Sequence, residues 1–282
     1  MAEKFTIAIC TLGHNPNLET CLDLLVKVKN QSSQDIQLLL VINNVPNQKK
    51  YDSNIKVVFE PVKGYSSARN KALFEVERNS SIIFIDDDEF PSHEWFNALV
   101  EKHNQYPMDI IFGPVFPLPN NIAGSYRDQF SEKFGKLNDG DVAKQAGAGN
   151  MLIPSGLLES QRITFDLAYN STGGEDTDLC FRVRKYGTEI RFAKKAIIYE
   201  IQSPDKYEPL YLEKRFIKDI SVYSVIVRRH ASRKQKVKRF LILCLRIISF
   251  SIRSIFRHEA IFYRNAYYKS LQSLITGKFI QG

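Results

Sequence analysis

The sequence predicts an α/β fold with a mostly parallel sheet flanked by helices, followed by a C-terminal helical extension. Short apolar runs without polar alternation recur between residues 4 and 199, as is typical of parallel strands that are buried on both faces. Segments with apolar residues at helical spacing separate these runs. From Tyr207 onward the pattern is helical to the end. We therefore expect a sheet-containing domain over residues 1–205 and a helical extension over residues 206–282.

The first part of the predicted sheet alternates between strands and helices. Its strands are apolar runs that end at turn residues: Lys4–Cys10, Ile36–Ile42, Lys56–Phe59, Ile82–Ile85 and Asp109–Val115. Its helices carry apolar residues three or four positions apart, and they are Asn17–Lys29, Ser66–Glu77 and Glu94–Asn104. This order is the pattern of a mostly parallel sheet with helices on both faces.

The second part of the domain is less regular. Residues 116–148 are rich in Pro, Asn, Gly and charges, and we predict a long connection there, of a length that is typically functional. A strand over Ala148–Pro154, a helix over Glu175–Tyr186 and short strands over Ile190–Ala193 and Ala196–Tyr199 are expected to follow.

The cysteines and the N-terminus indicate a cytosolic protein. Cys10, Cys21, Cys180 and Cys244 are scattered without a CxxC pair, so neither a disulfide framework nor a zinc site is indicated. The chain enters a strand-like run at Phe5–Cys10 without a basic segment and a long apolar segment before it. We therefore expect no secretory signal.

Basic residues concentrate in the predicted extension. The formal net charge is +8. Residues 206–282 hold 17 Lys and Arg against 4 Asp and Glu, whereas residues 1–205 hold 22 against 27. The basic character therefore belongs to the extension, which indicates a distinct partner there.

Three consecutive carboxylates, Asp86-Asp87-Asp88, directly follow the apolar strand Ile82–Ile85. They lie at the carboxyl end of that strand, where open α/β sheets bind ligands. Adjacent negative charges repel one another, so the three are best explained by a hard divalent cation that is bridged to a substrate phosphate. The alternative is that they cap the helix beginning near Ser92, which explains one or two aspartates better than three.

Two glycine turns lead into predicted helix N-termini. The turn at Gly64 precedes Ser66 and offers N–H groups and a positive dipole to an anion or a nucleobase edge, although many loops cap helices in this way. Gly173-Gly174-Glu175-Asp176 places carboxylates where the dipole stabilises the ionised form that a general base needs. We expect Asp178 to be a first-turn helix charge. Between these turns, the small residues of 146–152 would let a sugar lie against the backbone.

Together and in this order, these segments resemble a family-2 glycosyltransferase with the GT-A fold, of the bacterial type that builds exopolysaccharide or lipopolysaccharide. The resemblance covers residues 5–216. It rests on Ile-Ala-Ile-Cys-Thr, Ser-Ala-Arg-Asn-Lys-Ala-Leu, Ile-Phe-Ile-Asp-Asp-Asp-Glu, Gly-Ala-Gly-Asn-Met-Leu-Ile, Gly-Gly-Glu-Asp-Thr-Asp-Leu and the Tyr-Glu pair at 199–200. Residues 1–205 would then be the nucleotide-sugar-binding and catalytic domain.

The resemblance implies roles for residues that bind the donor. Asp86-Asp87-Asp88 match the family's DxD motif, in which Asp88 would bind Mn²⁺ or Mg²⁺ and Asp86 would lie nearer the ribose. Thr11 and Arg69 match positions that line the nucleotide pocket. Asn43 falls where many members have an aspartate that contacts uracil. This departure leaves the identity of the nucleobase open.

The resemblance also implies roles at the reacting centre. Asp176 matches the general base, and Glu175 matches the neighbouring residue near the acceptor. Glu200 falls where some members have a metal-binding histidine. The Gln-x-x-Arg-Trp motif of processive synthases is absent, because Glu213-Lys214-Arg215-Phe216 keeps only the arginine. This favours the addition of a single sugar.

The expected activity is therefore the inverting, metal-dependent transfer of one hexosyl or N-acetylhexosaminyl unit. The donor would be a nucleotide sugar, with UDP expected, and the acceptor a hydroxyl of a cell-surface glycan or of a lipid-linked molecule. One alternative is a nucleotidyltransferase acting on sugar phosphates, but Thr11-Leu12-Gly13-His14-Asn15 lacks the cation expected after the first strand. A second alternative is a membrane-associated scaffold with a degenerate fold, which the intact acidic motifs disfavour.

The predicted helix over residues 234–257 is both apolar and basic. Arg239, Arg246 and Arg253 recur every seventh residue and interrupt the apolar run. The apolar stretch is therefore too short, and the segment too charged, to span a bilayer. We expect it to lie on the anionic inner face of the cell membrane as a peripheral helix. The alternative is that it packs against the domain or against a sister subunit. Aromatic and basic residues interleave over 263–269, but no nucleic-acid fold accompanies them, and we expect no nucleic acid.

Overall fold

The computed structural model describes residues 3–44, 49–118, 136–161, 163–201, 203, 206, 208–255 and 259–280. The chain divides into two compact units. The sheet unit comprises Met1–Ser171 and Val183–Gln202, and the helical unit comprises Thr172–Arg182 and Ser203–Gly282. A short segment before residue 183 thus clusters with the C-terminal helices instead of with the sheet.

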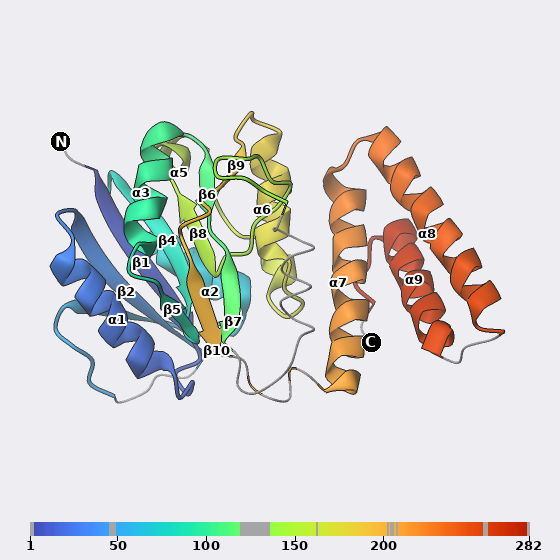
Figure 1. Ribbon diagram of the computed structural model, residues 1–282, viewed down its shortest axis with the longest axis horizontal. Coiled ribbons are helices and arrows are strands. Elements are labelled where there is room, and N and C mark those ends of the chain that lie inside the picture. Colours follow the sequence, from blue (N-terminus) through green and yellow to red (C-terminus); the bar gives the residue numbers. More distant parts are fainter. Residues whose placement is uncertain are drawn as a thin grey trace. The chain divides into compact units, whose positions relative to one another are not determined.

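A seven-stranded sheet forms the centre of the sheet unit (Figure 1), with the strand order β3-β2-β1-β4-β8-β6-β9. Its strands are β1 (Lys4–Thr11), β2 (Asp35–Asn43), β3 (Ile55–Glu60), β4 (Ser80–Asp86), β6 (Ile110–Phe112), β8 (Asn150–Ile153) and β9 (Ile190–Phe192). β1 pairs in parallel with β2 and β4, β2 with β3, and β6 with β9, whereas β8 runs antiparallel to β4 and β6. The predicted α/β fold with a mostly parallel sheet is confirmed.

A second sheet has three strands in the order β5-β10-β7. They are β5 (Glu89–Pro91), β7 (Val115–Leu118) and β10 (Ile198–Ile201). The single strand predicted over Asp109–Val115 is thus divided between the two sheets at Gly113-Pro114. A Cβ on Gly113 would lie 2.0 Å from the carbonyl oxygen of Ala196, and the proline cannot donate to a ladder.

Five helical segments of the sheet unit are described around the larger sheet: α1 (Leu18–Gln31), α2 (Tyr65–Glu75), α3 (Trp95–Gln105), α5 (Ser155–Gln161) and the 3₁₀ helix η1 (Leu167–Tyr169). The first three were predicted from their apolar spacing. The last two were not, since segments of 7 and 3 residues are too short for a helical period to be recognised.

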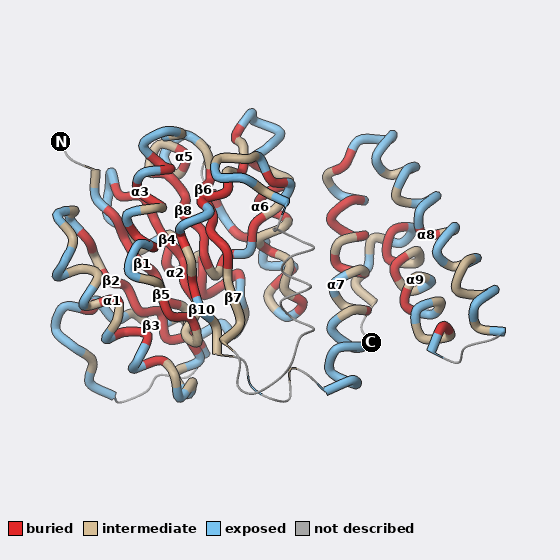
Figure 2. Tube along the Cα trace, viewed as in Figure 1, coloured by how far each residue is buried: buried red, intermediate tan, exposed pale blue. Residues whose placement is uncertain are grey.

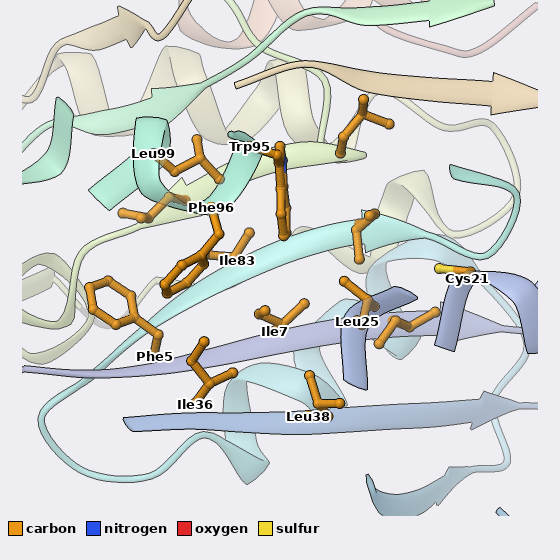
Figure 3. Close-up of a cluster of buried hydrophobic side chains, with 14 of the residues drawn as sticks. Phe5, Ile7, Cys21, Leu25, Ile36, Leu38, Ile83, Trp95, Phe96 and Leu99 are labelled. Carbon is orange, nitrogen blue, oxygen red and sulfur yellow. The ribbon is translucent and has the colours of Figure 1, made fainter. Parts of the chain in front are cut away.

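The main core lies between the sheet and helices α1 and α3 (Figure 3). Alternate residues of the strands point toward these helices. The buried side chains drawn and labelled there are Phe5, Ile7, Cys21, Leu25, Ile36, Leu38, Ile83, Trp95, Phe96 and Leu99. Each fully buried aliphatic or aromatic side chain contributes about 1.5–3 kcal/mol of transfer free energy. This core fixes the sheet whose strand ends carry the polar residues discussed below.

Most of the predicted connection over 116–148 lies outside the described residues. Its described ends are β7 and the segment from residue 136, in which Val142 forms a bridge with Arg191.

The helical unit contains α6 (Glu175–Arg184, of which residues up to Arg182 belong to this unit), α7 (Pro209–His230), α8 (Arg233–Arg253) and α9 (Glu259–Thr276). α8 begins with a capping box, in which the Gln235 N–H donates to the Ser232 hydroxyl and the Ser232 N–H donates to Oε1 of Gln235 at 2.8 Å. Rings from three helices meet in this unit: Phe216, Phe250, Tyr263 and Tyr267. Within the described part of the chain, no helix is long and apolar enough to cross a membrane.

Candidate active site

An acidic cluster forms at the carboxyl end of β4. β4 ends at Asp86, and the turn at Asp87-Asp88 carries the chain into β5, which begins at Glu89. The pairing of β10 with β5 places Glu200 opposite Glu89, and the Ile201 N–H donates to the backbone oxygen of Asp88 at 3.1 Å. The fold therefore brings four predicted site residues together with a fifth carboxylate. We call Asp86, Asp87, Asp88, Glu89 and Glu200 the acidic cluster.

Glu89 was not predicted from the sequence. Its side chain is buried, and Oε2 accepts a hydrogen bond from the Asp86 N–H at 2.8 Å. Burial raises the pKa of Glu89 well above its usual value, and the negative charges of Asp86, Glu200 and Asp88 raise it further against the lowering effect of that hydrogen bond. The only sequence signal was its place directly after three aspartates, which does not reveal that it points inward.

Asp87 organises the loop that follows β1. Its Oδ2 accepts a hydrogen bond from the Thr11 hydroxyl, and its Oδ1 accepts one from Nδ2 of Asn15 at 2.8 Å. The Thr11 oxygen in turn accepts from the Gly13 N–H at 2.9 Å. Gly13 has a φ of 82°, in the left-handed region that glycine adopts without strain. Thr11 and Asp87, both predicted to line the nucleotide pocket, thus contact each other directly.

Arg69 supplies a positive charge to the acidic cluster. Its side chain on α2 is buried, and Nη2 lies 3.2 Å from Oδ1 of Asp86. A buried guanidinium is stable only when it is paired. The ion pair therefore connects α2 to the end of β4 and partly offsets the charge of the cluster.

Asn43 holds the turn that precedes α2. Its Nδ2 donates to the backbone oxygens of Glu60 at 3.1 Å and Val62 at 2.8 Å, and its Oδ1 accepts from the Gly64 N–H at 2.8 Å. Both amide hydrogens are therefore used within the chain, so a contact with a nucleobase would fall on the remaining lone pair of Oδ1.

Asn170 caps the N-terminus of α2. The Ser67 N–H donates to Oδ1 of Asn170 at 2.8 Å, and the Tyr65 N–H donates to its backbone oxygen at 3.2 Å. A Cβ on Gly64 would lie 2.4 Å from Cγ of Asn170. These N–H groups, which the sequence suggested for an anion or a base, are thus satisfied by the chain itself.

Gly149 lies against the acidic cluster. A Cβ at this position would come within 2.5 Å of Oε1 of Glu89 and 2.9 Å of Oδ2 of Asp86. The neighbouring Asn150 is buried and accepts a hydrogen bond from the Trp95 indole at 2.8 Å. The small-residue segment over 146–152 therefore lines the cluster at Gly149, where a side chain would not fit.

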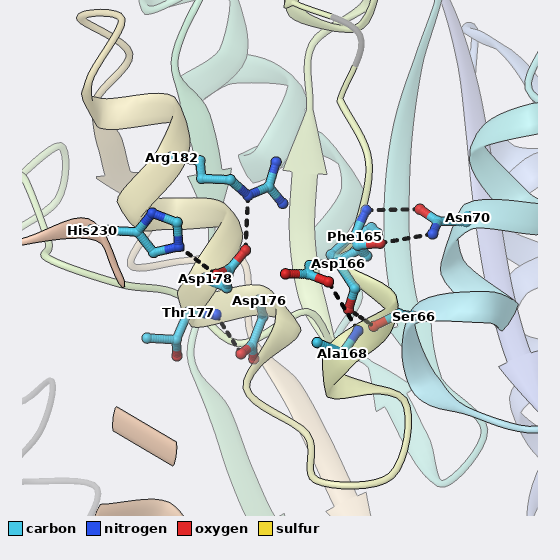
Figure 4. A network of polar contacts seen from close by, with 10 residues as sticks. All are labelled: Ser66, Asn70, Phe165, Asp166, Ala168, Asp176, Thr177, Asp178, Arg182 and His230. Carbon is cyan, nitrogen blue, oxygen red and sulfur yellow. Dashed lines mark hydrogen bonds and ion pairs between the residues drawn. The ribbon is translucent and has the colours of Figure 1, made fainter. Parts of the chain in front are cut away.

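The predicted base belongs to α6 in the helical unit (Figure 4). Glu175 is buried, Asp176 is half-buried, and Oδ1 of Asp176 accepts from the Thr177 N–H at 2.5 Å. Asp178 is fully buried, with its carboxylate 2.8 Å from Nε of Arg182 and 2.6 Å from Nε2 of His230. Asp178 lies in the first turn of α6, as expected, but its burial and its two side-chain partners were not predicted.

The partners of Asp178 determine its ionisation. Burial alone would raise its pKa, but the hydrogen bonds from His230 and Arg182, and the positive charges of these residues, outweigh burial and hold the pKa below its usual value. The Asp178 carboxylate therefore joins the C-terminal end of α7 to the first turns of α6 as a charged group.

No group of three or more His, Cys, Asp and Glu side chains among the described residues is arranged to hold a metal ion.

Comparisons with known proteins agree with the fold and with the motifs. The model of glycosyl transferase family 2 matches residues 6–147, and that of glycosyl transferase family group 2 matches residues 81–274. The uncharacterized glycosyltransferase EpsJ of Bacillus subtilis (strain 168) is 32% identical over 119 residues, which are 39% of this chain and 33% of EpsJ. The chain thus matches about a third of that relative's length.

A solved structure shares the fold. S. aureus TarS 1–349, crystallised in complex with UDP-GlcNAc, is similar with a TM-score of 0.62 and 15% sequence identity, over 97% of this chain and 81% of TarS. Two family models match, and each covers half of the sequence or more. The chain belongs to glycosyl transferase family 2.

Proposed function

We propose that this protein transfers one hexosyl or N-acetylhexosaminyl unit from a nucleotide sugar, a UDP-sugar above all, to a hydroxyl of a cell-surface glycan or lipid-linked acceptor, with inversion at the anomeric carbon. The observation that carries the proposal is the acidic cluster at the carboxyl end of β4 in a chain of family 2. The UDP-GlcNAc bound to TarS supports a nucleotide-sugar donor. Membership of the family disfavours a nucleotidyltransferase.

The acidic cluster offers the kind of donor that a hard divalent cation, Mn²⁺ or Mg²⁺, takes, although its side chains are not arranged around a metal position in this structure. It consists of carboxylates, whose oxygens are the ligands that such cations prefer. Burial first, and then the negative charges of Asp86, Glu200 and Asp88, raise the pKa of Glu89, and a bound cation would offset that negative charge. Asp88 and Glu200 would hold the ion, which when bound neutralises the charge that develops on the diphosphate leaving group.

The other predicted site residues of the sheet unit would bind and orient the donor. Asp86 is already positioned by Arg69, and Asp87 by Thr11 and Asn15. Such preformed contacts reduce the cost of ordering the site when the nucleotide binds. Because Gly149 lies close to the carboxylates and has no side chain, its backbone faces the cluster.

In the helical unit, Asp176 would act as the general base. Its carboxylate takes the proton of the acceptor hydroxyl while the hydroxyl oxygen forms a bond to the anomeric carbon. The bond from that carbon to the diphosphate oxygen breaks on the opposite face, and the electron pair leaves with the nucleoside diphosphate. One displacement of this kind inverts the configuration. Glu175 would contact the acceptor.

Replacing Asp176 with asparagine tests the assignment. We expect the turnover number with acceptor, or the slow hydrolysis of a nucleotide sugar, to fall by about 10²–10⁴-fold, since the amide cannot take a proton. Calorimetric affinity for UDP should be unchanged. Asp23→Asn, an exposed aspartate of α1, is the matched control and should retain full activity.

A second measurement tests the binding of the donor. UDP binding in the presence of Mn²⁺ should weaken when the metal is chelated, and Asp88→Asn should lose this metal dependence. A wild-type protein that binds no UDP with or without metal would favour a scaffold, and a fully active Asp176→Asn variant would refute the assigned base.

A further inference from the structure

α8 presents an apolar face that the fold does not use. Leu243 is the only buried residue of this helix, although most of its second half is aliphatic or aromatic. Figure 2 shows exposed and intermediate residues along almost the whole of α8. A helix that packs only within a folded unit normally carries polar residues on its outer face. The outer face of α8 therefore requires another explanation.

The five most exposed apolar residues of α8 form one stripe at helical spacing, and Phe240 and Ile242, exposed by 42% and 39%, lie to either side of it. The five residues of the stripe are exposed by 51–66%, and they are Val237, Leu241, Leu245, Ile248 and Ile252. Steps of four, four, three and four residues keep them on the same side of the helix. The stripe runs for about 22 Å along the axis. We call these five residues the α8 stripe.

The basic residues of α8 are divided between the interior and the edges of the stripe. Arg239 points inward, because its guanidinium donates to the Ser224 hydroxyl and to the backbone oxygen of Ile220, and lies 5.0 Å from the centroid of the Tyr223 ring. The regular arginine spacing seen in the sequence therefore does not form one exposed cationic face.

Exposed cations nevertheless border the stripe. Lys234 and Lys238 are exposed near its beginning and lie within about 60° of its centre at 3.6 residues per turn. Arg246 and Arg253 are exposed on the other side of the helix, with their guanidinium groups 6.0 Å from the Tyr267 ring centroid and 5.3 Å from the Phe250 ring centroid. α8 contains seven Lys and Arg residues and no Asp or Glu. Its surface thus combines an apolar stripe with uncompensated positive charge, the composition of helices that lie in the headgroup region of a bilayer.

We propose that α8 attaches this protein to an anionic membrane surface, with the α8 stripe inserted among the acyl chains and the bordering lysines at the lipid phosphates. The charge of the helix selects this partner over a second copy of the chain, because two stripes placed face to face would bring the exposed lysines beside them close together, and α8 has no acidic residue to compensate them. The seven Lys and Arg residues among the 21 residues of α8 favour a helix that lies in the membrane plane over one that spans the bilayer.

Sedimentation of the full-length protein with lipid vesicles tests the proposal. The protein should sediment with vesicles that contain phosphatidylglycerol and phosphatidylcholine in equal parts, and only weakly with vesicles of phosphatidylcholine alone. Added salt should weaken the binding, since it screens exposed charges. Lys234→Gln and Lys238→Gln should each lower the vesicle partition coefficient by about fivefold.

Variants of the stripe provide the decisive comparison. The double variant Leu245→Gln with Ile248→Gln should lower the partition coefficient by at least about tenfold, because two exposed apolar side chains no longer enter the bilayer. Both positions are exposed, so far-UV circular dichroism should show an unchanged fold. Phe74→Gln is the matched control: Phe74 is 81% exposed on α2 of the sheet unit, and its replacement should leave vesicle binding unchanged.

Three results would overturn the proposal. The first is wild-type protein that stays in the supernatant, or that binds both kinds of vesicle equally. The second is a double variant that sediments as wild type does. The third is a dimer, detected by light scattering, that the double variant converts to monomers while vesicle binding is absent; the stripe would then contact a second copy of the chain.

Discussion

Replacing His230 with alanine should destabilise the helical unit through Asp178. The Asp178 carboxylate is fully buried and has two charged partners in the described structure, Nε of Arg182 at 2.8 Å and Nε2 of His230 at 2.6 Å. Alanine removes the second partner and leaves the carboxylate with Arg182. Because the side chain of Asp178 has no exposed surface, any water that replaces the lost donor must be ordered in the space that the imidazole leaves.

The expected loss in the free energy of unfolding follows from two contacts of His230. A hydrogen bond to a charged group contributes about 1.5–3 kcal/mol to the free energy of unfolding. The imidazole also packs against the Phe181 ring with centroids 6.5 Å apart, and such a contact adds about 0.5–1.5 kcal/mol. We therefore expect the His230→Ala variant to lose about 2–4 kcal/mol. His230→Gln keeps an N–H donor on a side chain of similar length and should recover about half of the loss.

Urea unfolding followed by circular dichroism measures the change, and hydrogen exchange of the α6 amides localises it. His93→Ala is the control, since His93 is exposed and lies in the sheet unit; its replacement should change the free energy of unfolding by less than about 0.5 kcal/mol. The reasoning is refuted if His230→Ala is as stable as this control and its α6 amides exchange at the wild-type rate.

The same carboxylate predicts a pH dependence. The folded state holds the pKa of Asp178 below its usual value, so its contribution to stability is complete above the pKa of the unfolded chain. This contribution is lost as the pH falls through the folded pKa. In Asp178→Asn, the acid-side decline of the free energy of unfolding should be shallower than in the wild type. Equal slopes in both proteins would contradict this.

Two further predictions concern the sheet unit. Gly149→Ala should weaken UDP binding by at least about tenfold in calorimetry, because its Cβ would lie 2.5 Å from Oε1 of Glu89; each tenfold step corresponds to about 1.4 kcal/mol. Gly156→Ala, whose Cβ would meet only the flexible end of a methionine side chain at 2.9 Å, should bind UDP as wild type does, and equal weakening in both variants would contradict the argument. Asn170→Ala removes the cap of α2 and should lower the free energy of unfolding by about 1–2 kcal/mol, so an unchanged urea midpoint would show that the cap contributes nothing.

The sequence predicts the larger sheet well because its strands are buried, so that each can be recognised from its own short stretch of sequence. β1, β2 and β4 are continuous apolar runs, and such runs are readable without knowledge of their neighbours. The position of Asp86 to Asp88 at the carboxyl end of β4 follows from the same pattern. The grouping of Glu200 with them was expected only from the resemblance to the family.

Features that depend on distant contacts could not be predicted. Gly113 ends β6 because the backbone of Ala196 occupies the space of a side chain, and no local pattern carries that information. Asp178 looks like any acid in the first turn of a helix until His230, 52 positions later, is placed beside it.

In the helical extension, too, tertiary contacts decide what the sequence alone could not predict. Its helices were predicted from composition, and the boundary between α7 and α8 follows from the Ser232 capping box. Which face of α8 is exposed depends on where α7 and α9 pack. Periodicity alone suggested an exposed arginine face, whereas contacts with Ser224 and Ile220 turn Arg239 inward.

A crystal soaked with UDP and Mn²⁺, examined by manganese anomalous scattering, tests the central claim most directly. The account predicts an anomalous peak bound by the Asp88 carboxylate, with the diphosphate of UDP coordinated to the same ion beside the acidic cluster. Manganese and nucleotide that both bind elsewhere, with the carboxylates of the cluster in contact with neither, would contradict it.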